Sequence, residues 1–233
     1  MILYVNGDSH SAGAEAVNSF AFADDDPLYR ALGRRPHPNN EKVSYGCLIA
    51  NKLFAILQCD AESASSNDRI IRTTREYLTQ QTPDAIIIGW STWEREEWLY
   101  EGQYWQINAG GVGDDWPDEF KHRYHDWITS LDHRQKEREA QDKIWAFHQE
   151  LSNIPHLFFN SYLALDFTEH RDWGNNYLYP YDDAYTYYHW LSNQGFHTVN
   201  PNSYHYGPDA HRAWADFLIP QLTKIINESI ITK

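Results

Sequence analysis

A serine and a histidine at opposite ends of the chain are of the types that act together in nucleophilic catalysis. Ser9 follows Gly7-Asp8 near the N-terminus, and His205 lies shortly before the C-terminal segment. A serine hydroxyl is a weak nucleophile until a neighbouring base takes its proton, and histidine suits that role because its pKa lies near working pH. Attack on a carbonyl also creates a negative oxygen, which fixed N–H or O–H donors stabilise. This chemistry requires a fold that brings Ser9, His205 and such donors together.

The segments between these two residues alternate between strand-like and helix-like patterns. Short apolar runs bounded by turn residues predict buried strands at 2–5, 55–61, 85–88 and 156–160. Apolar residues at helical spacing predict helices at 41–54, 67–80, 117–151 and 208–226. Such alternation is typical of a parallel sheet with helices on both faces. Ligands bind these sheets at the carboxyl ends of the strands, which is where Ser9, residues 64–67 and Ser91 fall.

Two aromatic-rich stretches interrupt this pattern, at about 91–116 and 166–206. We expect both to be irregular insertions in a single domain that spans residues 1–233. The chain holds 10 Trp and 16 Tyr, whose side chains combine an apolar face with a polar tip. The two insertions are therefore expected to form the wall of a substrate site.

The order of the polar motifs resembles the SGNH (GDSL-type) serine hydrolases. Gly7-Asp8-Ser9-His10 after the first strand is similar to the first sequence block of that family. The stretches 60–69, 88–92 and 202–205 resemble the second, third and last blocks in the same order. The resemblance covers the whole chain, and it implies a three-layer α/β/α, flavodoxin-like SGNH hydrolase fold with a parallel sheet.

The resemblance also implies roles for individual residues. Ser9 would be the nucleophile and His205 the general base, with an oxyanion hole made of the backbone N–H groups of Ser9 and Ala64 and the side chain of Ser91. Three positions depart from the family pattern: Ala64 replaces a glycine, Ser91 an asparagine, and Asn202 the aspartate that orients the histidine. Replacing that aspartate by asparagine in a serine protease costs about 10⁴ in kcat.

The group that orients His205 is therefore open at the level of the sequence. Asn202 could do so through its side-chain oxygen, a backbone carbonyl could serve, or an aspartate could be brought in by the fold. Asp209 and the pair Asp182 and Asp183 are candidates for such an aspartate.

Polar and aromatic residues beside these blocks are expected to bind the substrate. They are Asp8, His10, Asn67, Trp90, Trp93 and Arg95. Arg95 is either a solvated charge or a residue that binds a substrate anion.

The leading hypothesis is hydrolysis of an oxygen ester, an acyl or acetyl group on a small molecule or glycan. The alternative is a degenerate SGNH fold that binds carbohydrate without cleaving it, which the substitutions at 64, 91 and 202 favour. A nucleotide-binding domain is a third interpretation, and the absence of GxGxxG and GxxxxGK[ST] counts against it.

Composition narrows the range of partners. The formal net charge is −14, which argues against nucleic acid and against an anionic membrane surface. Cys47 and Cys59 lie in apolar stretches and are expected to be free thiols, and no metal-binding spacing or cofactor motif occurs. The N-terminus does not have the pattern of a signal peptide, and no apolar run reaches about 20 residues. We therefore expect a cytoplasmic enzyme without a metal or cofactor.

Overall fold

The core of the protein is a four-stranded parallel sheet. The computed structural model describes residues 1–17, 32, 34–111, 116–165 and 170–231. Its strands lie in the order β2-β1-β3-β6 and comprise β1 (Ile2–Gly7), β2 (Ile56–Cys59), β3 (Ala85–Trp90) and β6 (His156–Asn160). The architecture confirms the parallel α/β fold predicted from the alternation of strands and helices.

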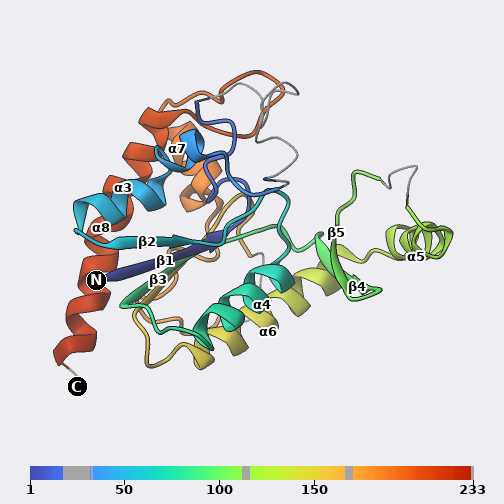
Figure 1. Cartoon of the computed structure of the whole chain (residues 1–233), viewed down its shortest axis with the longest axis horizontal. Helices are drawn as coiled ribbons and strands as arrows, with labels where there is room; N and C mark the ends of the chain where they lie inside the picture. Colours follow the sequence, from blue (N-terminus) through green and yellow to red (C-terminus); the bar gives the residue numbers. More distant parts are fainter. Residues whose placement is uncertain (18–31, 33, 112–115, 166–169, 232–233) are drawn as a thin grey trace.

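Helices cover both faces of this sheet (Figure 1). The helices α3 (Tyr45–Lys52) and α8 (Pro208–Ile231) pack on one face, and α4 (Asn67–Leu78) and α6 (His133–Glu150) on the other. Alternate residues of a strand point to opposite faces, so the strands contribute to two separate clusters. Val5 joins the cluster under α3 and α8, whereas Tyr4 joins the cluster under α4 and α6. Because both faces are covered, β1, β3 and β6 are buried almost throughout and largely apolar.

Two predicted helices are each divided in the structure. The segment 41–54 contains the end of a short helix, α2 (Pro38–Glu41), and then α3, whose first turn is capped by the Ser44 side chain. The segment 117–151 contains α5 (Asp118–Thr129) and α6. The Asp132 side chain accepts a hydrogen bond from the N–H of Gln135 and so starts a new helix. Helical periodicity does not reveal such a break, because apolar residues recur on both sides of it.

The first aromatic-rich stretch was expected to be irregular, but it contains a β-hairpin. Its strands are β4 (Glu96–Tyr100) and β5 (Gln103–Ile107), joined by Glu101-Gly102. Both loop residues have positive φ, 47° and 79°, as a two-residue hairpin turn requires. Of the second stretch, 166–169 lie outside the described residues. The remainder contains a short 3-10 helix, η1 (Asp183–Tyr185), and α7 (Tyr187–Asn193).

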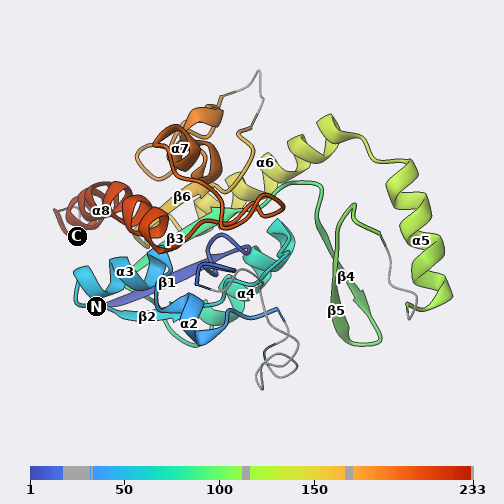
Figure 2. The same ribbon diagram turned by 90° about the horizontal axis from the view of Figure 1, so that it is seen from above.

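The hairpin and α5 extend away from the sheet (Figure 2). They share a hydrophobic cluster of their own, built largely from aromatic side chains: Trp98, Ile107, Phe120 and Tyr124, with Tyr100, Trp105, Trp116, Trp127 and Ile128 packed against them. Most tryptophans of the first insertion therefore pack against α5. Among the described residues, no helix is both long enough and apolar enough to cross a bilayer.

Candidate functional site

The turn that follows β1 presents Ser9 at the carboxyl edge of the sheet. A Cβ atom on Gly7 would lie 2.1 Å from Ser11 Oγ and 2.8 Å from the carbonyl oxygen of Gly89, so only glycine fits there. Beyond it the chain folds back, and the N–H of Ala14 donates to the Ser9 carbonyl at 2.9 Å. This close packing holds Ser9, the residue that the sequence predicts as the nucleophile.

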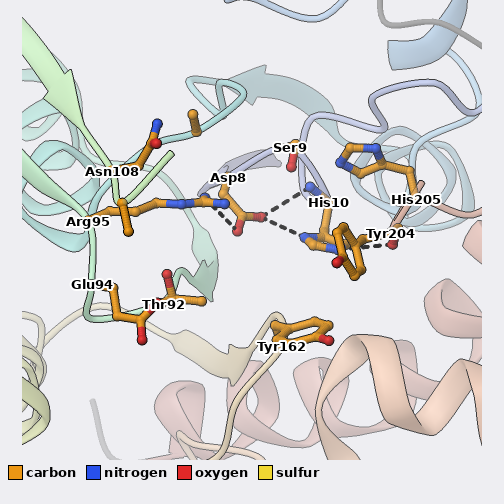
Figure 3. Close-up of a pocket in the computed structure, with 12 residues that line it drawn as sticks. Asp8, Ser9, His10, Thr92, Glu94, Arg95, Asn108, Tyr162, Tyr204 and His205 are labelled. Carbon is orange, nitrogen blue, oxygen red and sulfur yellow. Dashed lines mark hydrogen bonds and ion pairs between the residues drawn. The ribbon is translucent and has the colours of Figure 1, made fainter. Parts of the chain in front are cut away.

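Ser9 and His205 line one cavity of about 440 Å³ (Figure 3). The other lining residues come from the loops that follow β1, β2, β3, β5 and β6 and from the segment before α8. The ring centroids of His205 and His10 are 5.2 Å apart. Within the described part of the chain, no hydrogen bond joins the Ser9 hydroxyl to the His205 ring. Such contacts are often long in unliganded sites and tighten when the substrate binds.

The group that faces Nδ1 of His205 is a glutamate from the turn that follows β1. Glu15 Oε2 lies 2.8 Å from His205 Nδ1, and the Ser203 hydroxyl donates to the same oxygen. The hydrogen bond from His205 is the main reason why the pKa of the Glu15 carboxyl lies below its usual range. A carboxylate on Nδ1 fixes the tautomer in which the proton is on Nδ1 and leaves Nε2 as the basic atom.

The groups proposed from the sequence to orient His205 have other contacts. Asn202 is exposed, and its backbone N–H donates to Asn200 Oδ1. Asp182 and Asp183 accept hydrogen bonds from the backbone N–H groups of Ala184 and Ala164, and Asp209 pairs with Arg212. No local sequence signal pointed to Glu15, because it lies 190 positions from His205.

Asp8 and His10 are buried and connect the turn that follows β1 to the loop that carries His205. Asp8 Oδ1 accepts from the backbone N–H of His10 at 3.0 Å and lies 3.1 Å from His10 Nδ1. His10 Nε2 lies 3.3 Å from the carbonyl oxygen of Tyr204. Burial alone would raise the pKa of Asp8, but His10 and Arg95 outweigh it and hold that pKa well below its usual range. Asp8 is therefore an anion that holds its neighbours in place.

The two further positions expected in an oxyanion hole differ in their surroundings. Ala64 lines the cavity with φ at 63°, the left-handed conformation that glycine adopts without strain. Ser91 is held by Asn67, which accepts from its N–H at 2.9 Å and donates to its carbonyl at 3.1 Å. Asn67 therefore positions the chain after β3. The Ser91 hydroxyl accepts a hydrogen bond of 2.8 Å from Arg95 Nη1.

The aromatic residues at the cavity are tyrosines. Trp90 is buried in the cluster under α4 and α6, and Trp93 packs against that cluster, so the structure does not bring either tryptophan to the cavity. Tyr162, just beyond β6, and Tyr204 line the cavity, with ring centroids 5.7 Å apart in an edge-to-face arrangement. Arg95 also lines it. The only sequence sign of Tyr162 was its place after a predicted strand.

No protein-family model matches this chain, and no curated protein matches it by sequence. Solved structures match it by shape. A carbohydrate esterase family 2 enzyme with a carbohydrate binding domain, from Corynascus thermopiles (Myceliophthora fergusii), aligns at 15% identity over 97% of this chain and 66% of its own, with a TM-score of 0.51. An acetyl xylan esterase from the rumen bacterium Butyrivibrio proteoclasticus aligns at 16% identity over 95% of this chain and 64% of its own, with a TM-score of 0.49.

This chain therefore spans slightly less than two thirds of the length of each of these two structures. At such low identity the likeness concerns the fold alone. The chain shares its α/β fold with the carbohydrate esterase family 2 structure, and this agrees with the parallel α/β fold that the sequence blocks implied.

Proposed function

We propose that this protein is an ester hydrolase with Ser9 as nucleophile, His205 as general base and Glu15 as the residue that orients His205. The observation that carries the proposal is the 2.8 Å contact between Glu15 Oε2 and His205 Nδ1, at a cavity that Ser9 and His205 both line. A nucleophile, a base and a third group that orients the base are the parts that this chemistry needs.

The reaction follows from these roles. Nε2 of His205 takes the proton of Ser9 as Oγ attacks the ester carbonyl, and the Glu15 carboxylate stabilises the imidazolium. The backbone N–H groups of Ser9 and Ala64 are the proposed donors to the oxyanion. The imidazolium then gives its proton to the departing alcohol, and a water activated by the same histidine releases the acid from the acylated serine.

The proposed substrate is a small acyl ester, such as an acetyl group on a carbohydrate. Support comes from Tyr162 and Tyr204, which line the cavity and offer ring faces on which a sugar could stack. Further support comes from the match to a structure described as a carbohydrate esterase. The net charge of −14 disfavours polyanionic substrates.

Labelling by a fluorophosphonate tests the proposal directly. The native chain should be labelled at Ser9 and should hydrolyse p-nitrophenyl acetate and acetylated xylo-oligosaccharides. Ser9→Ala should lose both properties, while Ser152→Ala, in the turn that follows α6, should keep them. Labelling and turnover that persist in Ser9→Ala would exclude Ser9 as the nucleophile.

The second candidate function is carbohydrate binding without cleavage. It is favoured by Ser91, which stands where the family pattern has an asparagine that donates to the oxyanion. The Ser91 hydroxyl accepts a hydrogen bond of 2.8 Å from Arg95. This alternative predicts that xylo-oligosaccharides bind in a calorimeter although Ser9 is not labelled and no acetate is released.

A further inference from the structure

Arg95 reaches across the carboxyl edge of the sheet to the turn that follows β1. Its Nη1 donates to Ser91 Oγ at 2.8 Å and lies 3.4 Å from both Asp8 Oδ2 and the carbonyl oxygen of Ser65. The side chain is 24% exposed and lines the cavity that contains Ser9. Figure 3 shows the guanidinium beside Asp8, the residue that precedes Ser9. The cation is therefore anchored next to the proposed nucleophile.

Ser91 is poorly placed to stabilise an oxyanion by itself. Its backbone N–H and carbonyl are both bound to the Asn67 amide, and its hydroxyl oxygen accepts from Arg95. Ser91 is also buried and is not among the described residues that line the cavity. On this side of Ser9, the guanidinium is a cationic donor that lines the cavity, together with the side chains of Thr92 and Asn108.

Arg95 retains donors for another acceptor. A guanidinium has five N–H groups in a rigid plane, and its hydrogen bonds within the described part of the chain all use Nη1. The contact with Asp8 is long, and Asp8 is also bonded twice to His10. The arginine charge is therefore only partly matched by its neighbours.

We propose that Arg95 is a catalytic residue that donates a hydrogen bond to the oxyanion, the role that the sequence predicted for Ser91. This inference rests on the proposed ester hydrolysis. As Ser9 Oγ bonds to the carbonyl carbon, the π electron pair moves to the carbonyl oxygen and the serine proton moves to His205. When the carbonyl re-forms, the pair returns, the bond to the alcohol breaks, and His205 returns the proton to that alcohol. Arg95 is unchanged throughout.

A competing role for Arg95 would be binding a carboxylate that belongs to the substrate. The cavity disfavours that role, since Glu94 and Asp8 also line it and a permanent anion would be repelled by both. An oxyanion exists only during the reaction and forms beside Ser9. The two roles differ kinetically: a substrate anion is bound in the ground state and affects KM, whereas an oxyanion donor affects kcat.

The test compares Arg95→Met with Arg75→Met, a control at the far end of α4 whose arginine pairs with Glu150. With p-nitrophenyl acetate, a neutral ester, Arg95→Met should lower kcat by about 10²–10³, the usual cost of one oxyanion donor, and should change KM by less than about threefold. Phenylboronic acid, whose serine adduct carries a tetrahedral anion, should bind more weakly in parallel. Arg75→Met should match the native chain in all three.

Several outcomes would overturn the inference. One is a folded Arg95→Met protein whose kcat is within threefold of the native value. Another is an Arg95→Met protein in which the only change is a higher KM for a hemisuccinate ester. If Arg95→Met does not fold, Arg95→Lys decides, because it keeps the charge but not the fork of donors. It should lose at least tenfold in kcat, and a native kcat would refute the role. If the native chain is neither labelled nor active, the proposed function fails; if it is active and Arg95→Met is equally fast, only this inference fails.

Discussion

Exchange of Glu15 for glutamine tests the contact that orients His205. The change removes a negative charge 2.8 Å from Nδ1 and keeps a hydrogen-bond acceptor of similar shape. At that distance, Coulomb's law gives about 1.5 kcal/mol in water and about 6 kcal/mol at an effective dielectric of about 20. The two side chains are only 20% and 18% exposed, so the true value lies between these limits. Since about 1.4 kcal/mol is tenfold in rate, kcat should fall between about 10-fold and about 10⁴-fold.

The assay is steady-state hydrolysis of p-nitrophenyl acetate from pH 5 to 9. Because the imidazolium forms only during the reaction, Glu15→Gln should lower kcat and leave KM nearly unchanged. Asn202→Asp is the matched control: Asn202 is exposed and Glu15 already occupies Nδ1, so kcat should stay within about threefold. The reasoning is refuted if Glu15→Gln keeps its full kcat while Asn202→Asp raises kcat tenfold or more. That pair of results would assign the orienting role to position 202.

Two further predictions concern stability. Ala64→Gly should keep kcat, because the backbone N–H remains. It should raise the Tm by up to about 4 °C, because an alanine at φ 63° carries about 1–2 kcal/mol of strain, which exceeds the entropy cost of glycine. A lower Tm would contradict this reasoning. Burial lowers the pKa of His211 to about 3, so the folded state keeps it neutral while the unfolded chain binds a proton below about pH 6.5. Stability should therefore fall as the pH drops from about 6.5 towards 3, by up to about 1.4 kcal/mol per unit from this group. Urea unfolding at pH 7.5 and 5 measures the slope, which should be shallower in His211→Gln; an equal slope would rule out His211 as its source.

The sequence was sufficient to predict the sheet and the proximity of Ser9 and His205. Short apolar runs that end in turn residues identified β1, β2, β3 and β6. In β1, β3 and β6 the run is apolar because both faces of the strand are buried. Once a parallel sheet was inferred, the residues after its strands had to meet at one edge. That argument placed Ser9 at this edge, and the resemblance to the last sequence block added His205, which lines the same cavity. These inferences depend on local patterns and on the topology of a parallel sheet.

The tertiary structure alone decided which groups lie beside these two residues. Glu15 reaches His205 only because the turn that follows β1 folds back beside the loop before α8. Arg95 donates a hydrogen bond to the Ser91 hydroxyl. The tryptophans of the hairpin pack against α5, and Tyr162 lines the cavity where those tryptophans were expected. A side chain's partner depends on packing between segments far apart in the sequence, and neither periodicity nor a short motif encodes that distance.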